Sequence, residues 1–287
     1  MKAGRPSPGG TGRSVRKKQP KNKHLPRPLP PPPRTAYSGG MSPPPKPHGR
    51  PRRPAPSSPL AERVLFIDGE AMVIDKPAGL PVDPPRDGGL SLENHLRGLT
   101  FGFARWPVPA HRLDRDTSGC LLLARNPKAA ARFVDAFAQR AVEKRYLAVL
   151  DGVPEQESGT IDLALGKTST RETGWRMVPD AAGKAALTHW RVLAAREGRA
   201  LIRFTPETGR THQLRAHALH GLGIGILGDP VYRDPARASA WADTLLLHAR
   251  ALRLPRANKA PVDATAPVPA LFAQAGFADA ETLDAVP

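Results

Sequence analysis

Acidic residues are missing from the first 60 residues of this 287-residue sequence, although the whole chain holds 26 Asp and Glu. The same segment contains 17 of the 34 prolines and 14 of the 43 Lys and Arg. Large apolar side chains are scarce there, so the segment cannot bury enough apolar surface to offset the entropy of ordering it. We therefore expect residues 1–59 to form a disordered basic tail and residues 60–287 to form one folded domain.

Cysteine is almost absent, since Cys120 is the only one, which excludes an intramolecular disulfide and fits a reducing cytoplasm. No apolar run approaches the ~18 residues that a membrane-spanning helix requires. Gly-rich phosphate loops and clusters of metal ligands are also missing, and His212 and His217 are five residues apart instead of the four of a helical zinc pair. The sequence predicts a cytoplasmic protein with no membrane span, no metal and no cofactor.

The formal net charge of +17 is distributed unevenly. Residues 61–287 hold 29 Lys and Arg against 26 Asp and Glu, so most of the excess lies in the tail. A polycationic tail attracts a polyanion without reading its sequence. RNA is the partner that we expect, an anionic membrane surface is the weaker alternative, and a solvated, dispensable tail is a third interpretation.

Short apolar runs outnumber helical repeats, and several adjoin as hairpins. Strands are expected at Val64–Ile67, Ala71–Asp75, Gly119–Ala124, Arg145–Leu150, Thr160–Leu165, Leu187–Ala194, Ala200–Phe204 and Leu245–Leu254. Helices are expected at Ser91–Leu96, from Asn126 to about Arg140, from Thr211 to about His220, and within Pro269–Gly276. This pattern predicts an α+β fold with a mixed, largely antiparallel sheet.

The segment His111–Gly119 concentrates polar residues directly before a predicted buried strand. Its carboxylates, Asp114 and Asp116, lie among Arg112 and Arg115, which favour the ionised form of a neighbouring carboxylate. An ionised carboxylate held near a sugar can act as a nucleophile or as a base. A solvated turn with ordinary ion pairs would explain the same residues. The segment alone therefore does not decide between a catalytic carboxylate and a solvated turn.

A second polar segment, Thr208–His217, opens a predicted helix, with Gly209 suited to the turn and Thr211 able to cap the helix. Arg215 lies in the first turns, from which a guanidinium can bind a carboxylate on a neighbouring loop in bidentate geometry. The alternative is a solvated helix arginine.

Tyr146 is one of only three tyrosines, and it follows the basic pair Lys144-Arg145 in an apolar strand. A ring at the edge of a cleft could stack on an unpaired base. A half-buried strand tyrosine with a satisfied hydroxyl is the alternative.

Taken together, these segments resemble the RluA-type pseudouridine synthases. The resemblance extends from about Arg63 to Phe272, with the motifs in the order of that family. It rests on Val73–Leu80, His111–Gly119, Lys144–Tyr146, Gly183–Thr188, Gly209–Arg215, Ile226–Tyr232 and Leu247–Ala249. An S4-type RNA-binding domain, which many members carry before the catalytic domain, has no counterpart in the apolar pattern of residues 1–59.

The resemblance implies the pseudouridine synthase fold, in which helices flank a central sheet with a catalytic cleft. It implies that the chain isomerises specific uridines in ribosomal or transfer RNA, without cofactor and as a monomer. Asp114 takes the position of the catalytic carboxylate, Arg215 that of its paired arginine, and Tyr146 that of the tyrosine stacked against the target base. The other residues that the resemblance places at the substrate are Leu214, His111, Arg112, Thr117 and Arg210.

The sequence leaves two other functions possible. A non-catalytic RNA-binding or ribosome-associated protein could use the same fold and the basic tail, and would bind RNA tightly without modifying it. A nucleoside or glycoside hydrolase also uses carboxylates at C1′ of a sugar, but that chemistry needs a second carboxylate, for which Asp116 is the nearby candidate.

Overall fold

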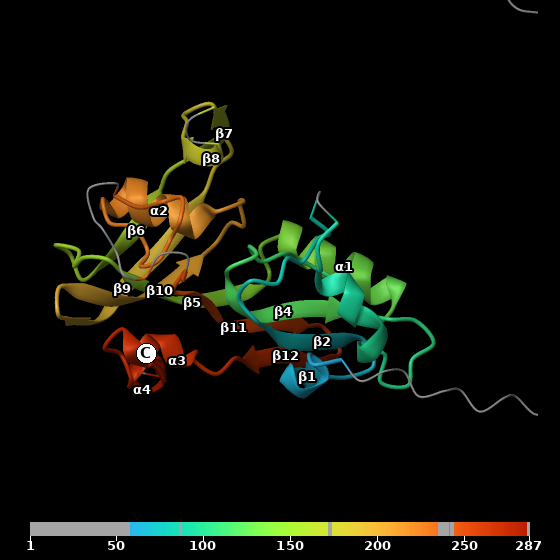
Figure 1. Cartoon of the computed structure of the whole chain (residues 1–287). Coiled ribbons are helices and arrows are strands. Elements are labelled where there is room, and N and C mark those ends of the chain that lie inside the picture. Colours follow the sequence, from blue (N-terminus) through green and yellow to red (C-terminus); the bar gives the residue numbers. More distant parts are fainter. Residues whose placement is uncertain (1–57, 86–87, 172–173, 235–240, 242–243, 286–287) are drawn as a thin grey trace, which may run out of the picture. The chain divides into compact units, whose positions relative to one another are not determined.

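The computed structural model describes residues 58–85, 88–171, 174–234, 241 and 244–285 (Figure 1). The tail expected at residues 1–59 falls on residues outside the described ones, apart from Ser58 and Pro59. Within this described part of the chain, no helix is both long enough and apolar enough to cross a bilayer.

A ten-stranded sheet organises the domain. Along its main path the strands follow the order β1-β2-β4-β11-β5-β10-β9-β6, while β12 pairs with β11 and β3 with β4. The bounds are β1 (Val64–Ile67), β2 (Ala71–Lys76), β3 (Val108–Pro109), β4 (Ser118–Ala124), β5 (Glu143–Leu150), β6 (Ser158–Asp162), β9 (Leu187–Arg196), β10 (Arg199–Pro206), β11 (Leu247–Arg256) and β12 (Lys259–Thr265). Only β4 and β11 pair in parallel among these described strands, which confirms the mixed, largely antiparallel sheet.

Strand β4 lies in the middle of the sheet, and all seven of its residues are buried. A continuous apolar run is what a strand covered on both faces requires. Gly119 near its start has φ +103°, and a Cβ there would collide with the carbonyl oxygen of Ala249 on β11. Only glycine fits this close parallel approach, which fixes where the polar loop before β4 enters the sheet.

Helices α1 (Pro127–Ala138) and α2 (Gln213–Leu222) both lie above the central strands in Figure 1, α2 towards the left and α1 towards the right. Helix α1 begins as predicted, since the Asn126 side chain accepts a hydrogen bond from the Ala129 amide at 2.9 Å. The expected cap of α2 at Thr211 is wrong, because its N-cap is His212, which has φ +51° and no side-chain cap bond. The other helices are 3₁₀ turns at Ala61–Arg63 and Leu92–Leu99, α3 (Ala270–Gln274) and α4 (Ala280–Ala285).

A separate two-stranded hairpin is formed by β7 (Leu165–Thr170) and β8 (Gly174–Pro179). The single strand expected at Thr160–Leu165 is wrong, because β6 ends at Asp162 and Leu165 already belongs to β7. The chain leaves the main sheet here because Leu165 bonds instead with the backbone of Lys184. Strands β3, β7, β8 and β12, the 3₁₀ turn at Ala61–Arg63 and helix α4 were not predicted.

Candidate active site

A pocket of about 470 Å³ lies between α1 and α2, with β5 and the loop before β4 completing its walls. This volume is within the range of about 300–1,000 Å³ that is typical of ligand sites. The residues predicted from the sequence all line this one pocket, although they come from three separate segments of the chain. They are His111, Arg112, Asp114, Thr117, Tyr146, Arg210, Leu214 and Arg215.

The loop that carries Asp114 is held from below by a buried lysine. The ammonium of Lys76 donates hydrogen bonds to the carbonyl oxygens of Pro77 at 2.8 Å, Leu80 at 2.8 Å and Arg115 at 2.9 Å. Lys76 has no exposed surface, and this burial lowers its pKa to about 8, against the opposing effect of Asp116 and Asp114. The three bonds satisfy the buried donor and tie the loop to the end of β2.

His111 attaches the other end of the loop to the sheet. Its Nε2 accepts a hydrogen bond from the Leu122 amide at 3.0 Å, and its ring stacks on Phe137 of α1 with centroids 4.4 Å apart. Burial, together with the nearby Lys144 ammonium, lowers the pKa of His111 to about 3. The imidazole is therefore neutral near pH 7, with its proton on Nδ1, and it positions the loop.

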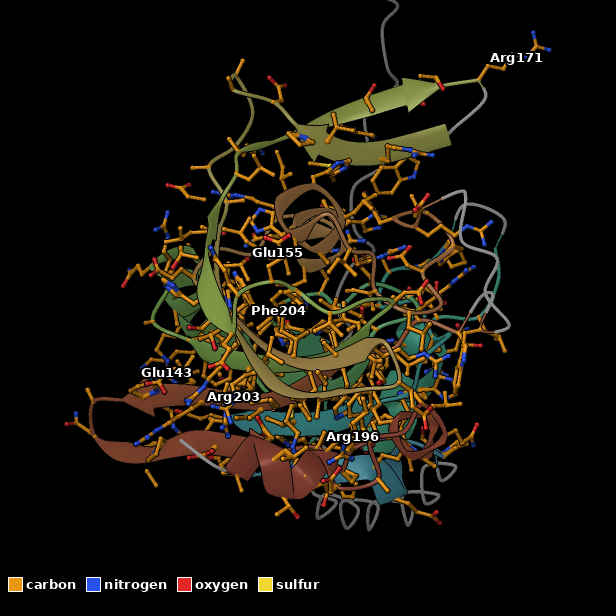
Figure 2. The ribbon with its side chains drawn as sticks, turned by 90° about the vertical axis from the view of Figure 1, so that its left-hand side faces the viewer. Glu143, Glu155, Arg171, Arg196, Arg203 and Phe204 are labelled. Atoms are coloured by element: carbon orange, nitrogen blue, oxygen red, sulfur yellow. The ribbon has the colours of Figure 1, made fainter. Side chains whose placement is uncertain are left out.

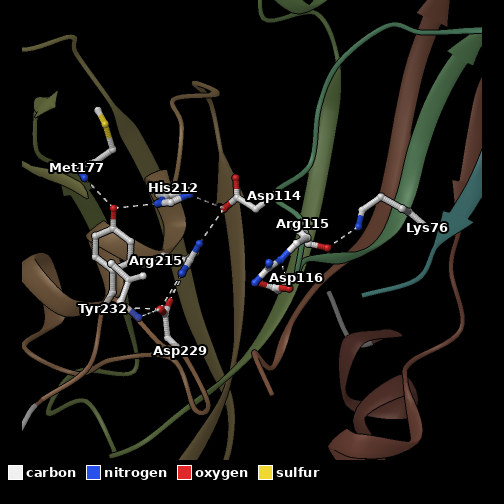
Figure 3. A network of polar contacts seen from close by, with 10 residues as sticks. Lys76, Asp114, Arg115, Asp116, Met177, His212, Arg215, Asp229 and Tyr232 are labelled. Carbon is white, nitrogen blue, oxygen red and sulfur yellow. Dashed lines mark hydrogen bonds and ion pairs between the residues drawn. The ribbon is translucent and has the colours of Figure 1, made fainter. Parts of the chain in front are cut away.

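The carboxylate of Asp114 points towards α2 (Figure 3). Its Oδ2 lies 3.5 Å from Arg215 Nη1 and 3.9 Å from His212 Nε2. These groups are 101 and 98 residues away in the sequence, so the fold alone brings them to the carboxylate. The Asp114 side chain is 18% exposed and therefore reachable from the pocket.

The bidentate partner of Arg215 is Asp229, not Asp114. Arg215 donates through Nε to Asp229 Oδ2 at 2.7 Å and through Nη2 to Oδ1 at 2.8 Å. Burial alone would lower the pKa of Arg215, but the bonds to Asp229 and the nearby Asp114 raise it. The arginine is thus a permanently charged group, oriented by one carboxylate and presented to a second.

Asp229 and Tyr232 complete the network, and neither was assigned a role from the sequence. Asp229 Oδ1 also accepts from the amides of Val231 at 2.8 Å and Tyr232 at 2.9 Å. The Tyr232 hydroxyl accepts from the Met177 amide of β8 at 2.8 Å and shares a 3.0 Å hydrogen bond with His212 Nδ1. The signal for both residues was present in the Leu-Gly-Asp-x-x-Tyr turn.

The arginines beside Asp114 in the sequence pair elsewhere. Arg112 binds Asp83 at 2.8 Å, and Arg115 binds Asp116 at 3.0 Å. Arg215 on α2, the arginine that the resemblance implies as the partner of Asp114, lies 3.5 Å from its carboxylate.

One wall of the pocket is apolar. Tyr146 packs against the cluster that contains Leu214, and both side chains line the pocket. Burial raises the pKa of Tyr146, and Asp114 and Cys120 raise it further, so the phenol stays neutral. Arg210 also lines the pocket, and its Nε donates to the Ala185 carbonyl at 3.0 Å.

The described residues contain no group of three or more His, Cys, Asp or Glu side chains able to hold a metal ion. What the pocket offers is one accessible carboxylate with a fixed guanidinium beside it, and an aromatic and aliphatic wall. Such a site can orient a flat, polar ring and present an anionic oxygen to an atom attached to it.

Comparison with known proteins agrees with this geometry. Residues 70–220 match the family model described as RNA pseudouridylate synthase. An uncharacterized RNA pseudouridine synthase of Zymomonas mobilis subsp. mobilis is 57% identical over 218 residues, which cover 76% of this chain and 99% of that protein. The ribosomal large subunit pseudouridine synthase C of Rickettsia prowazekii is 33% identical over 196 residues, covering 68% of this chain and 64% of the relative, so the match spans less than two thirds of that protein.

A solved structure, named human RNA pseudouridylate synthase domain containing 4, superimposes with a TM-score of 0.63 at 29% identity. The superimposed region covers 75% of this chain and 91% of the human chain. The family model spans the loop with Asp114, the strand with Tyr146 and the helix with Arg215. This chain belongs to the family of RNA pseudouridylate synthases.

Proposed function

We propose that this chain converts specific uridines in structured RNA to pseudouridine, with Asp114 as the catalytic carboxylate. The observation that carries the proposal is the placement of Asp114 Oδ2 in the pocket, 3.5 Å from a guanidinium that Asp229 holds in place. Membership of the family supports RNA as the substrate, and the pocket supplies the chemistry.

A uridine in folded RNA is stacked, so it must turn out of the helix before its sugar can reach the pocket, at a cost of about a few kcal/mol. Asp114 then acts on the ribose, either by attacking C1′ or by removing the proton at C2′. In both routes the N1–C1′ bond breaks, the uracil rotates and C5 bonds to C1′; C5 then loses its proton and N1 gains one. In the second route the C2′ proton is returned when C5 bonds to C1′, so the product is an isomer of the substrate. In both routes a carboxylate oxygen of Asp114 is the reacting atom, and the Arg215 guanidinium lies 3.5 Å from the carboxylate.

The remaining pocket residues have distinct proposed roles. Tyr146 and Leu214 provide a flat, apolar wall on which the everted base can stack. Arg112 and Arg210 line the pocket, where a guanidinium can bind the phosphates that flank the base. His111 and Thr117 hold the loop, and their contacts with β4 and Asp114 support a positioning role.

Ribosomal RNA is the substrate class that the comparisons favour, because named relatives such as the protein of Rickettsia prowazekii are ribosomal large subunit synthases. Transfer RNA is the alternative from the sequence. The hydrolase alternative loses support, because its second carboxylate, Asp116, is paired with Arg115 and does not line the pocket. Asp229 cannot replace it, since that side chain is fully buried and occupied by Arg215.

The test is an Asp114→Asn variant with Asp116→Asn as its matched control, since both are carboxylates of the same loop. Tritium release from labelled uridine, or carbodiimide mapping, measures pseudouridine formation on ribosomal large-subunit RNA transcribed in vitro. We expect Asp114→Asn to lose at least about 10³-fold in rate while it still folds and binds RNA, and Asp116→Asn to stay within about threefold of wild type.

Robust pseudouridine formation by Asp114→Asn would refute the assignment of the catalytic carboxylate. Release of free uracil by the wild-type protein would favour the hydrolase, because isomerisation changes no mass. Tight RNA binding by the wild-type protein, without modification of any ribosomal or transfer RNA, would favour the non-catalytic alternative.

A further inference from the structure

His212 lines the pocket at the start of α2, where its backbone has φ +51°. A residue other than glycine is uncommon in this left-handed region, and it persists only where its surroundings hold it, as they often do at functional sites. The imidazole makes no cap bond to α2. The contacts of the ring within the pocket, and not helix capping, therefore indicate what His212 does.

Contacts on two sides fix the plane of the His212 ring. Its Nδ1 lies 3.0 Å from the hydroxyl of Tyr232, which is fully buried. The Trp175 ring of β8 stacks on it with centroids 4.7 Å apart and an angle of 27° between the planes. Figure 2 shows the β7–β8 hairpin, which carries Trp175, lying beyond α2 with Arg171 at its outer end. Because the plane and Nδ1 are both fixed, the direction of the remaining nitrogen, Nε2, is fixed as well.

The Tyr232 hydroxyl decides which nitrogen of His212 carries the proton. Its oxygen accepts a hydrogen bond from the Met177 amide at 2.8 Å. Its own proton needs an acceptor, because a buried hydroxyl that donates to nothing is costly. Among the described residues, Nδ1 of His212 is the acceptor within hydrogen-bonding distance. The hydroxyl therefore donates to Nδ1, and the imidazole carries its proton on Nε2.

The charge state of His212 agrees with this arrangement. Burial lowers its pKa, and the nearby Asp114 carboxylate opposes that effect only in part. The ring is therefore mostly neutral near pH 7 and offers one N–H donor to the pocket.

This donor faces the same carboxylate oxygen as the guanidinium of α2. His212 Nε2 lies 3.9 Å from Asp114 Oδ2, and Arg215 Nη1 lies 3.5 Å from that oxygen (Figure 3). Both distances are longer than a good N–H···O hydrogen bond, and a shift of about 1 Å would close them. Hydrogen bonds of this kind often tighten only when the substrate is bound. Figure 3 marks no contact at the other oxygen, Oδ1, with the residues drawn, which leaves Oδ1 for the ribose.

We propose that His212 is a positioning residue for the reaction. When RNA is bound, its Nε2–H donates to Asp114 Oδ2, so that His212 and Arg215 together hold this oxygen and Oδ1 is the one that reacts with the ribose. The inference rests on the proposed function, since it concerns the reacting carboxylate. A misplaced reacting atom lowers the rate and not the affinity for substrate, so His212 acts on kcat.

Two substitutions separate this role from backbone strain. His212→Asn places an amide oxygen near the position of Nδ1, which keeps an acceptor for Tyr232 and suits the left-handed backbone, but provides no donor for Asp114. His212→Gln is longer and reaches the position of Nε2, so it restores the donor although it suits the backbone less well. Strain therefore predicts the higher kcat for His212→Asn, whereas donation to Asp114 predicts the higher kcat for His212→Gln.

His189 on β9 provides a matched control. Its Nδ1 lies 2.9 Å from the Thr160 hydroxyl and its Nε2 lies 2.9 Å from Glu207, so its partners are also a hydroxyl and a carboxylate. It is not among the residues that line the pocket. His189→Asn therefore removes contacts of the same kind away from Asp114.

The experiment measures kcat and KM for pseudouridine formation on ribosomal large-subunit RNA, and urea unfolding checks that each variant is folded. We expect His212→Asn to lower kcat about 10–100-fold with KM within about twofold of wild type. His212→Gln should recover kcat to within about fivefold of wild type, and His189→Asn should leave both constants unchanged.

The position of the proton can be measured without any reaction. In protein labelled with nitrogen-15 at its nine histidines, the chemical shifts should show His212 protonated at Nε2 and unprotonated at Nδ1. The signal that is lost in His212→Asn identifies this residue. Tyr232→Phe removes the donor to Nδ1 and should shift His212 towards a mixture of the two neutral forms.

Unchanged kcat in His212→Asn, or a lower kcat in His212→Gln than in His212→Asn, would overturn the proposal. A rise in KM with unchanged kcat would also overturn it, because His212 would then bind RNA instead of positioning Asp114. A proton on Nδ1 in the wild-type protein would have the same consequence. If the wild-type protein modified no uridine, the proposed function would fail and the positioning role with it, whereas the nitrogen shifts alone would decide whether the proton is on Nε2.

Discussion

Helices α1 and α2 flank the same pocket but are built in different ways. Helix α1 follows local rules, with Asn126 as its cap, Pro127 in its first turn and an apolar side that buries Ala129 and Phe133. Helix α2 breaks those rules, since it opens with a left-handed His212 and buries Arg215 in its first turns. Its buried polar residues are Gln213, Arg215 and His217.

The difference between the two helices shows that the destabilising features are concentrated in α2, which carries the groups that face Asp114. A left-handed residue other than glycine and a buried guanidinium each cost free energy, and they persist only where the surroundings compensate them. Here Asp229 accepts a hydrogen bond from the buried guanidinium of Arg215, and Tyr232 shares a hydrogen bond with the left-handed His212. These contacts compensate part of both costs. Helix α1 serves as a wall, whereas α2 carries the groups that face the carboxylate.

The largest effect is expected when the buried ion pair of α2 is broken. Asp229→Asn leaves the Arg215 charge buried without its counter-charge, and should lower the free energy of unfolding by about 3–5 kcal/mol and reduce kcat strongly. Urea unfolding and a single-turnover assay measure the two effects. The matched control on α1 is Arg132→Gln, which breaks a 2.7 Å pair with Glu70 whose arginine is 50% exposed.

Because exposed pairs contribute little, Arg132→Gln should cost at most about 1 kcal/mol and leave kcat unchanged. Equal destabilisation by the two variants would contradict the distinction between the helices.

Acidification should have a smaller effect on stability, and this effect should differ between the two helices. Helix α1 contains no histidine and contacts His111 through Phe137, whereas burial lowers the pKa of His217 and His220 on α2 and of its capping residue His212. A folded-state pKa below 6.5 means that the unfolded chain binds more protons under about pH 6.5, so stability is lost as pH falls through that value.

Amide hydrogen exchange at pH 7.5 and pH 5 measures this difference helix by helix, once intrinsic rates are taken into account. Protection in α2 should decrease more than protection in α1 at the lower pH. Parallel losses in both helices would show that the acid response is global and does not depend on these histidines.

The smallest effect is expected at the cap of α1. Asn126→Ala removes the hydrogen bond to the Ala129 amide, and should lower the free energy of unfolding by about 1 kcal/mol. Thermal or urea unfolding measures this loss, and kcat should stay unchanged because α1 supplies a wall and no charged group at Asp114. A marked fall in kcat would mean that α1 also positions the reacting groups.

Much of the fold could be predicted because local patterns carried it. The apolar run of β4 and the Asn-Pro start of α1 were both identified within a residue or two. Strand β12 was missed because Lys259–Thr265 contains a proline and small residues and is a strand only through its pairing with β11. The β7–β8 hairpin was missed because its base is held by Tyr232, which lies more than 50 residues away.

The sequence predicted which residues line the pocket, but not all of the ion pairs and hydrogen bonds between them. Asp114, Arg215 and Tyr146 were expected to meet, and they line one pocket. Along the chain, Arg112 and Arg115 are the nearest cations to Asp114, and the resemblance to the family implied Arg215 as its partner. The structure places Arg215 3.5 Å from Asp114, and it pairs Arg112 with Asp83 and Arg115 with Asp116.

The sequence by itself determined most of the strands and helices that form the main sheet and line the pocket, the basic character of the first 60 residues, and the polar segments that form the site. Hydrophobic periodicity and turn chemistry act between residues a few positions apart, so they can be read without a structure. Only the tertiary structure decided which carboxylate each guanidinium binds, that buried Lys76 supports the catalytic loop, and that Trp175 lies against His212. Such contacts depend on which distant segments the packed sheet brings together, and no local pattern encodes that choice.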